Sequence, residues 1–236
     1  YSFLVKAVAD STLHASISNQ VEFFAVQNPI PQYSYISSTS VSGDSVLITY
    51  LGDNSVGVSE VYLYRSFDNG INFTRIDSEI NPVFPITFHV LDAMPNERSS
   101  MYQVSVLDAC GNQIAYSNVG KTILLSVDNN DYALKSLNWN SYIRWEVGVE
   151  NYEVRVRQQN MNSFQNVVYL DSSFNSYLHE INNFITPPFG GEVCYKIKAL
   201  ELLNSFGEQG ISESNEVCIQ QQLMVSIPNA LYVGGL

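Results

Sequence analysis

The cysteines are the residues of this chain whose type and spacing point most directly to chemistry. Cys194 and Cys218 fall in two runs that alternate apolar and polar residues, which is typical of half-buried strands. If the two strands pair, both cysteines lie on the face opposite Tyr195 and Ile197, and facing Cα atoms are about 4.5 to 5.5 Å apart, within disulfide range. We predict this disulfide, which closes a loop of 24 residues (218 − 194). The alternative is two reduced thiols on the surface.

A disulfide at this position indicates an oxidising compartment, either a periplasm or the cell exterior. Cys110, within Asp108-Ala-Cys-Gly111, has no partner at a similar place in the chain.

The other residues give no catalytic or metal-binding pattern. His14, His89 and His179 are scattered along the chain, and none has a second histidine or a cysteine at metal-ligand spacing. We expect all three to be exposed or half-buried strand residues. Glycine-rich phosphate loops, His-Asp-Ser sets and nucleophile-elbow sequences are absent from the sequence. The prediction is that the chain is not an enzyme and binds no cofactor.

The densest acidic cluster is Asp128-Asn-Asn-Asp131. Calcium favours such oxygen ligands, but the next residues, Tyr132 and Ala133, stand where the calcium-loop pattern needs an oxygen ligand and a glycine. We therefore interpret the cluster as a polar connector between two modules rather than as a metal site.

Charge and aromatic content restrict the partners. With 11 Lys and Arg against 23 Asp and Glu, the formal charge is −12, so the cations that neutralise phosphates are too few for nucleic acid or an anionic membrane. Aromatic residues make up 12% of the chain, and tyrosines such as Tyr62 and Tyr64 could point outward from a strand. Exposed aromatic rows bind surface glycans or other proteins, although they equally often only cover a sandwich.

An internal repeat shows how these residues are positioned. A Ser-Asn pair follows an alternating strand pattern three times, at Ser18-Asn19, Ser117-Asn118 and Ser214-Asn215. The intervals are 99 (118 − 19) and 97 (215 − 118) residues, and each is roughly the length of one β-sandwich of about 100 residues. Tyr50 and Trp139 occupy matching places upstream of the pairs, which predicts that both are core aromatics.

The repeat divides the chain into four segments. Residues 1–26 are predicted to be the C-terminal strand pair of a preceding module, because a lone hairpin is marginally stable in water. Pro29 and Pro31 favour an extended connector. Two complete modules are predicted over 27–127 and 128–222, the second with the disulfide, and residues 223–236 follow them.

Each complete module reads as an antiparallel β-sandwich. Val, Ile, Tyr, Phe and Thr dominate the alternating runs, and no helical periodicity is sustained, so the fold class is all-β. The predicted strands of the first module are 33–41, 46–50, 60–65, 73–76, 86–91, 101–109 and 115–127. Those of the second are 137–139, 152–157, 167–170, 177–181, 192–200 and 214–221.

Short motifs identify a family resemblance. Leu137-Asn-Trp139, Tyr195-Lys-Ile-Lys-Ala199 and the Ser214-Asn215 strand, at this period, resemble fibronectin type III modules. Leu107-Asp-Ala-Cys-Gly-Asn112 and Ser214-Asn-Glu-Val-Cys218 resemble fibronectin-like repeats near the C-terminus of large Bacteroidetes surface proteins. Cys194-Tyr-Lys-Ile-Lys-Ala199 belongs to the same resemblance, and in that group the Cys-Tyr segment is bridged to the Glu-Val-Cys segment, which agrees with the predicted disulfide between Cys194 and Cys218.

The last residues resemble a secretion signal. Val225-Ser-Ile-Pro-Asn-Ala230 is similar to the opening of the gliding-motility-associated C-terminal domain, the type B sorting domain of the type IX secretion system. The resemblance places the start of that domain at Ile227, Pro228, Asn229 and Ala230, and it implies the type IX translocon and an outer-membrane shuttle protein as partners. Leu231-Tyr-Val-Gly-Gly-Leu236 departs from the usual Phe-Thr-Pro-Asn-Gly-Asp-Gly continuation. The alternative is a terminal strand or linker.

Two tripeptides resemble a Bacteroidetes O-glycosylation signal. Asp10-Ser-Thr12 and Asp44-Ser-Val46 fit its Asp-Ser/Thr-aliphatic-or-Thr pattern, which implies sugars on Ser11 and Ser45. The alternative is that both serines are ordinary turn residues.

Together the repeat and the resemblance predict a non-catalytic stalk. We expect tandem fibronectin-like sandwiches of a large secreted adhesin that is associated with the outer membrane at the cell surface, and the resemblance implies a role in gliding motility. One alternative is a set of linker modules of a secreted polysaccharide- or protein-degrading enzyme whose catalytic domain lies upstream. Another is that the modules themselves bind carbohydrate or protein.

Overall fold

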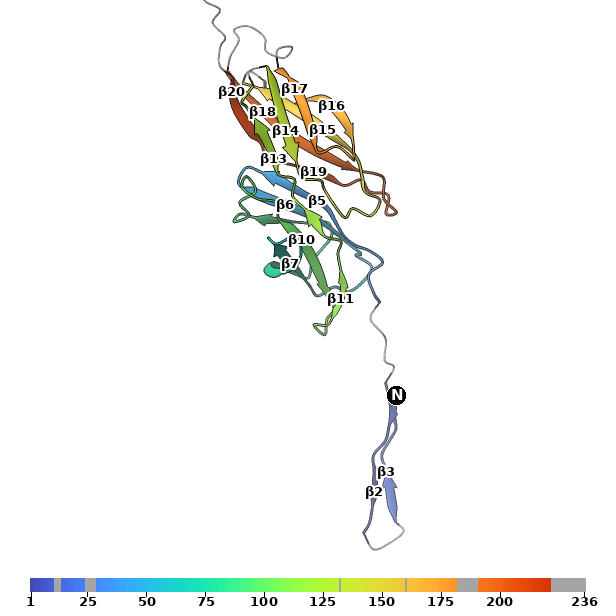
Figure 1. Cartoon of the computed structure of the whole chain (residues 1–236). Helices are drawn as coiled ribbons and strands as arrows, with labels where there is room; N and C mark the ends of the chain where they lie inside the picture. The colour runs from blue at the N-terminus through green and yellow to red at the C-terminus, as the bar shows by residue number, and fades with distance from the viewer. Residues whose placement is uncertain (11–13, 24–28, 132, 160, 182–190, 222–236) are drawn as a thin grey trace, which may run out of the picture. The chain divides into compact units, whose positions relative to one another are not determined.

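The computed structural model describes residues 1–10, 14–23, 29–131, 133–159, 161–181 and 191–221 (Figure 1). By its internal contacts the chain divides into two units, Tyr1–Ile30 and Pro31–Leu236. The elements of the described ranges are β-strands. Among the described residues there is no helix with the length and apolarity needed to cross a bilayer.

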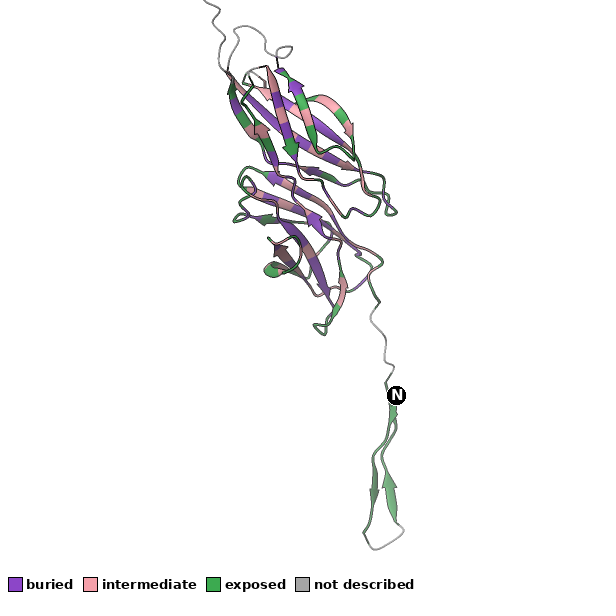
Figure 2. Ribbon diagram, in the orientation of Figure 1, coloured by how far each residue is buried: buried purple, intermediate pink, exposed green. Residues whose placement is uncertain are grey.

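The first unit contains a long hairpin, called here the N-terminal hairpin, which comprises the described residues between Tyr1 and Phe23. One arm contains β1 and β2, and the other contains β3 and β4, with β1 paired to β4 and β2 to β3 in antiparallel register. All of its described side chains are exposed, so its strands are green throughout in Figure 2. The bounds are β1 (Ser2–Phe3), β2 (Lys6–Val8), β3 (Ala15–Ile17) and β4 (Val21–Glu22).

The first sandwich packs a three-stranded sheet on a larger one. The small sheet has the order β5-β6-β9, and the large sheet has the order β11-β10-β7-β8, with β12 also pairing with β10. The small-sheet strands are β5 (Ser34–Ser42), β6 (Ser45–Gly52) and β9 (Ile86–Val90). The large-sheet strands are β7 (Glu60–Ser66), β8 (Thr74–Ile80), β10 (Met101–Leu107), β11 (Gln113–Tyr116) and β12 (Gly120–Lys121).

The second sandwich repeats this plan. Its small sheet has the order β13-β14-β17, and its large sheet has the order β16-β15-β18-β19, with β20 also pairing with β18. The small-sheet strands are β13 (Leu125–Asp128), β14 (Leu134–Trp139) and β17 (Ser176–Glu180). The large-sheet strands are β15 (Val149–Gln158), β16 (Gln165–Asp171), β18 (Gly191–Glu201), β19 (Ile211–Glu213) and β20 (Val217–Gln221).

Both sandwiches therefore have the strand order of fibronectin type III-like, immunoglobulin-like domains, which confirms the predicted fold class. In each, the first, second and fifth strands face the third, fourth, sixth and last. Figure 2 shows the buried residues alternating along the strands of both sandwiches. The apolar faces meet in two cores, in which Tyr50 and Trp139 are buried at matching positions, opposite Ile36 and Leu125 of the first strands. A buried aromatic ring removes about 150 to 250 Å² from water, so these residues dominate core energetics.

The predicted strand 115–127 is wrong as a single element. The structure divides it into β11, β12 and β13, and β13 belongs to the second sandwich, where it pairs with β14. The first strand of that sandwich therefore begins at Leu125, before the predicted module boundary at 128. Ile123 also packs in the second core. The alternating pattern runs across the boundary because both neighbouring modules need strands there.

The acidic cluster Asp128–Asp131 is not a connector between modules. It begins the turn between β13 and β14, inside the second sandwich. The Asp128 carboxylate accepts a hydrogen bond from the Asn130 N–H, and Asp131 accepts from the N–H groups of Ala133 and Leu134 at 2.7 and 2.9 Å. These carboxylates stabilise the turn through backbone hydrogen bonds.

The Ser-Asn pairs interrupt the last strand of every hairpin. Ser117 lies between β11 and β12, where its hydroxyl accepts a hydrogen bond from the Val104 N–H at 2.8 Å. The carboxamide of Asn118 then bonds the backbone of Ile36, accepting from its N–H at 2.6 Å and donating to its carbonyl at 3.1 Å. In the second sandwich Asn215 bonds Leu125 in the same way, at 2.7 and 3.1 Å. Each asparagine thus ties the final hairpin of a sandwich to the first strand of the same sandwich.

Candidate functional site at the joint between the sandwiches

The two sandwiches meet through their edge strands β5 and β19. The backbone N–H of Thr39 donates to the hydroxyl of Ser212 at 2.9 Å, and the N–H of Glu213 donates to the hydroxyl of Ser40 at 3.1 Å. Thr39 and Ser212 are fully buried. Edge strands expose unpaired backbone groups that invite association. At this contact, which we call the joint, serine hydroxyls satisfy two of those groups across the boundary.

A buried carboxylate lies at the centre of the joint. Glu201, at the end of β18, has no exposed surface. It accepts hydrogen bonds from the Tyr35 hydroxyl, from the Gly210 N–H at 3.0 Å and from the Asn204 carboxamide at 3.3 Å. The Tyr35 oxygen accepts in turn from the N–H of Glu146 at 3.1 Å. Because a buried charge is costly unless it is hydrogen-bonded, these donors from both sandwiches make the carboxylate depend on the joint being closed.

The same contact raises the pKa of Tyr35 above its usual range, first because the phenol is buried and second because it donates to Glu201. The phenol therefore stays a donor even at an alkaline pH near 10, where an exposed tyrosine begins to lose its proton.

Gly210 is required by the close approach of the two sandwiches. A Cβ atom at this position would lie 2.6 Å from the Ser37 carbonyl oxygen and 2.8 Å from the Trp145 ring. The Trp145 indole N–H donates to that same carbonyl at 3.2 Å. Any larger residue at Gly210 would therefore separate β5 from the second sandwich.

Two further contacts close the joint on its other side. The Asn118 carboxamide, which bonds Ile36, also donates to the Arg144 carbonyl of the second sandwich at 3.1 Å. The Tyr142 phenol lies 3.3 Å from the Thr39 hydroxyl, and its ring packs on Trp145 with centroids 3.9 Å apart. Burial raises the pKa of Tyr142 to about 12.

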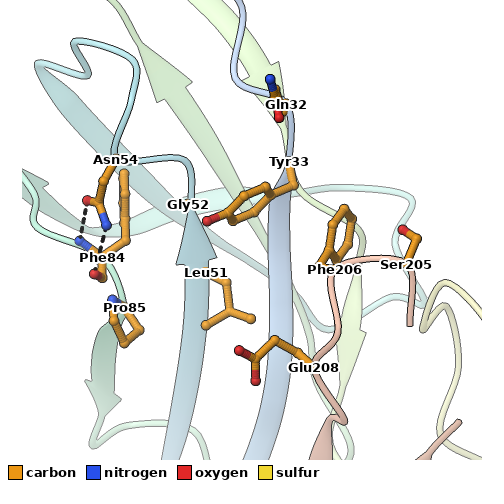
Figure 3. Close-up of a pocket in the computed structure, with 10 residues that line it drawn as sticks. All are labelled: Gln32, Tyr33, Leu51, Gly52, Asn54, Phe84, Pro85, Ser205, Phe206 and Glu208. Carbon is orange, nitrogen blue, oxygen red and sulfur yellow. Dashed lines mark hydrogen bonds between the residues drawn. The ribbon is translucent and has the colours of Figure 1, made fainter. Parts of the chain in front are cut away.

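A hollow of about 570 Å³ opens at the rim of the joint (Figure 3). Tyr33 and Phe206 come from different sandwiches, and their ring centroids are 5.2 Å apart. On the opposite wall, Asn54 and the backbone of Phe84 exchange two hydrogen bonds of 3.0 Å. Glu208 adds a carboxylate to the lining. Aromatic faces with a few polar groups can stack a sugar ring or hold an apolar side chain.

The outward-facing tyrosines Tyr62 and Tyr64 form a less open binding surface than the hollow does. Tyr62 and Tyr64 lie on the same face of β7, because the residues between and before them, Leu63 and Val61, point into the core. The guanidinium of Arg75 lies 3.5 Å from the centroid of the Tyr62 ring and covers it. Binding of surface glycans or of other cell-surface proteins stays a prediction.

The predicted disulfide is present. Cys194 of β18 faces Cys218 of β20, and a disulfide joins them with Cα atoms 3.9 Å apart, closer than the expected range. Cys194 is buried and Cys218 is exposed. The Glu192 carboxylate also lies near the two sulfurs. Among the described residues this is the one group with metal-ligand proximity, but sulfurs consumed in a disulfide are not thiolate ligands.

One of the three histidines, His179, is more buried than predicted. His14 and His89 are exposed, as predicted, whereas His179 is buried. Its Nδ1 lies 2.9 Å from the Tyr195 hydroxyl, and burial lowers its pKa. His179 is therefore a core residue of the second sandwich. The strand pattern could have shown this, because Tyr177, His179 and Ile181 alternate on one face.

Of the remaining predicted sites, Ser45 and Cys110 lie in the described part of the chain. Ser45 begins β6, and its hydroxyl donates to the Ser42 carbonyl at 2.8 Å, so it has a turn role, and its glycosylation stays a prediction. Cys110 is exposed, with no disulfide partner in the described part of the chain. Ser11 and the sorting-domain residues Ile227, Pro228, Asn229 and Ala230 lie outside the described residues.

The joint was not predicted from the sequence. The residue that could have indicated it is Glu201, which continues the inward-facing series Tyr195, Ile197 and Ala199 along β18. A charged residue at an inward position requires partners from another element. That signal identifies a buried polar contact, but it does not identify Tyr35 as the partner.

Comparison with known proteins adds a limited similarity. No family model matches the chain, and no curated protein matches it. Among solved structures, the crystal structure of chicken CNTN1 FN1-FN3 domains is similar over 94% of this chain and 77% of that chain, with 14% sequence identity and a TM-score of 0.32. The fold assignment rests on the strand order described above.

The disulfide should contribute to the stability of the second sandwich. Replacing both cysteines, Cys194→Ser with Cys218→Ser, should lower the free energy of unfolding by about 3 kcal/mol, because a loop of 24 residues is no longer closed in the unfolded chain. Urea unfolding followed by circular dichroism measures the change. Cys110→Ser is the matched control and should leave the midpoint unchanged. An equal midpoint for the double variant and the parent would contradict the prediction.

The buried phenol at the joint should make stability fall in alkali. The pKa of Tyr142 is about 12 in the folded protein, against about 10 for an unfolded tyrosine. Between these values only the folded state keeps the proton, so stability falls with rising pH by about 1.4 kcal/mol per pH unit. Tyr142→Phe should make this decline less steep, as measured by urea unfolding at several pH values.

At pH 8, below both pKa values, Tyr142→Phe should cost only the lost hydrogen bond, about 1 kcal/mol. Identical slopes for the variant and the parent above pH 10 would contradict the assignment.

Proposed function

We propose that the chain is a non-catalytic spacer region of a large secreted adhesin. The observation that supports this most strongly is the joint, in which one sandwich completes the hydrogen bonding of buried groups of the next. The carboxylate of Glu201 and the hydroxyl of Tyr35 come from different sandwiches, and both are buried. A flexible pair of domains would leave such groups unpaired whenever it bent. The joint therefore favours a stiff rod over a hinged pair.

The chemistry of the joint also suits a structural role. Its carboxylate is closed off from solvent and accepts from three donors. Burial raises the pKa of Tyr35 and Tyr142, so neither phenol offers a phenolate near neutral pH. A general base or nucleophile needs access to a substrate, and neither group has it.

The proposal extends to export and location on the basis of the terminal resemblance. Residues 223–236, with Ile227 to Ala230 at the start of a type B sorting domain, would deliver the protein to the type IX translocon and the outer-membrane shuttle protein. The disulfide agrees with an oxidising compartment. The protein would then stand on the cell surface, associated with the outer membrane, with gliding motility as one process that it could serve.

A second candidate function is the passive linker of a secreted polysaccharide- or protein-degrading enzyme. The same joint supports it, because a stiff spacer serves a catalytic domain as well as a binding domain. The hollow at Tyr33 and Phe206 favours a third function, binding of surface glycans or of another surface protein, because it places two aromatic rings beside polar groups.

The stiffness of the joint can be tested with Gly210→Ala. The added methyl group would clash with Ser37 and Trp145, so the sandwiches should separate, at a cost of about 1 to 3 kcal/mol as for other overpacked sites. Spin labels at Glu79→Cys and Asn166→Cys, in a Cys110→Ser background, report the distance between the sandwiches. We expect a narrow distance distribution in the parent and a broad one in the variant.

Gly57→Ala is the matched control, because a Cβ atom there would have no atom within 4 Å. It should leave the distribution narrow. A broad distribution in the parent chain would overturn the spacer proposal.

The export role has a separate test. Removing residues 223–236 from the native full-length protein should leave it in the periplasm, as measured by cell fractionation and surface proteolysis. The control is Cys194→Ser with Cys218→Ser, which alters the last sandwich but keeps the terminal segment. Normal surface display of the truncated protein would refute the export role and leave the spacer role standing.

A further inference from the structure

The N-terminal hairpin has the same strand register as the last hairpin of each sandwich. In all three, the first arm pairs with the second at matching positions on both sides of the Ser-Asn pair. The pairs near the base are Phe3 with Val21, Tyr102 with Gly120 and Tyr195 with Val217. The pairs nearer the tip are Lys6 with Ile17, Ser105 with Tyr116 and Lys198 with Glu213.

The serine of the hairpin makes the same hydrogen bonds in each copy. The Ser18 hydroxyl accepts from the Val5 N–H at 2.9 Å and donates to the Asn19 carbonyl at 2.9 Å. Ser117 and Ser214 accept from the N–H groups of Val104 and Ile197 at 2.8 and 2.9 Å. They donate to the carbonyls of Asn118 and Asn215 at 2.6 and 2.7 Å. These shared hydrogen bonds align the three hairpins residue by residue. In this alignment Val5 corresponds to Val104 and to Ile197.

This equivalence identifies an uncovered core face. Val104 and Ile197 have no exposed surface, whereas Val5 is 73% exposed. Phe3 is 60% exposed, although its counterparts Tyr102 and Tyr195 are fully buried. The hairpin thus presents, toward solvent, the side chains that in both sandwiches pack against the small sheet.

Asn19 indicates which strand should lie against that face. Asn118 and Asn215 each bond the N–H and the carbonyl of one residue in the first strand of the sandwich that their hairpin completes. Asn19 stands at the same place after Ser18, and its carboxamide has no hydrogen-bond partner in the described ranges. Its geometry suits one backbone N–H and one carbonyl of an extended strand.

We propose that the N-terminal hairpin is the final strand pair of a third sandwich, and that it packs on a five-strand body formed by an earlier segment of the same native protein. In both complete sandwiches the hairpin follows its own body in the chain. That order favours an earlier segment over a second copy of the chain or a separate partner. Asn19 then binds the first strand of this body, and Phe3, Val5 and Ala7 enter its core. The inference does not depend on the spacer role.

Cysteine labelling can test this burial. Val5→Cys and Leu4→Cys are each placed in the 236-residue chain and in the native full-length protein, with Cys110→Ser in both. Maleimide labelling at residue 4 or 5 is followed by the mass of the peptide that contains it. Val5→Cys should react at least about tenfold more slowly in the full-length protein, as for other buried positions reached only by local opening. Leu4→Cys is the control, because its counterparts Gln103 and Lys196 keep part of their surface exposed, and it should be slowed much less.

The proposed contact of the Asn19 carboxamide can be tested separately. In the full-length protein, adding Asn19→Ala should speed the labelling of Val5→Cys, and the neighbouring control Gln20→Ala should not. Hydrogen exchange of the peptide 1–10 in the unsubstituted proteins gives the same comparison without a core substitution, with slow exchange expected only in the full-length protein.

Two results would overturn the proposal. Equal labelling and equal exchange in both proteins would show that no body covers the hairpin. Protection of Val5→Cys already in the 236-residue chain, with a dimer in sedimentation, would assign the face to a second copy.

Discussion

The paired sandwiches depend on one buried carboxylate. Glu201 ends a strand whose preceding inward residues are apolar, and its carboxylate oxygens accept hydrogen bonds from Tyr35 of the other sandwich, from Gly210 and from Asn204. Removing any one donor leaves a desolvated acceptor. The lack of room for a Cβ atom at Gly210 and the covering of the β5 edge by β19 both accompany the close approach of these groups. Because hydrogen bonds are directional, these contacts favour one arrangement of the two sandwiches.

The repeated Ser-Asn pair links the final hairpin of each sandwich to other strands. The serine interrupts the last strand and satisfies a backbone N–H of the neighbouring strand. The asparagine then reaches the first strand of the same sandwich, and Asn118 also reaches Arg144 of the next. Two polar residues thus connect strands that are far apart in sequence, close each sandwich and contribute to the joint.

The sequence predicted the all-β class, the repeat, the core aromatics Tyr50 and Trp139 and the disulfide, because each depends on local alternation or on regular spacing. It failed at the boundary 128, since alternation continues from β12 into β13 and nothing local separates the last strand of one module from the first of the next. His179 was placed wrongly because its polarity outweighed its position between Tyr177 and Ile181. The joint was missed because Tyr35 and Glu201 are 166 residues apart. No pattern within one strand specifies such a pairing.

The disulfide lies within the ladder between β18 and β20, with three residue pairs beyond it toward the end of β20. A pulling force applied at the C-terminal side would peel β20 away one hydrogen bond at a time. Peeling would stop at Cys218, where the covalent bond transfers the tension to β18 at the centre of its sheet. Further extension would then have to shear several strands at once. The cross-link therefore converts an unzipping geometry into a shearing one, and the mechanical strength of the second sandwich is set by its central strands rather than by its edge.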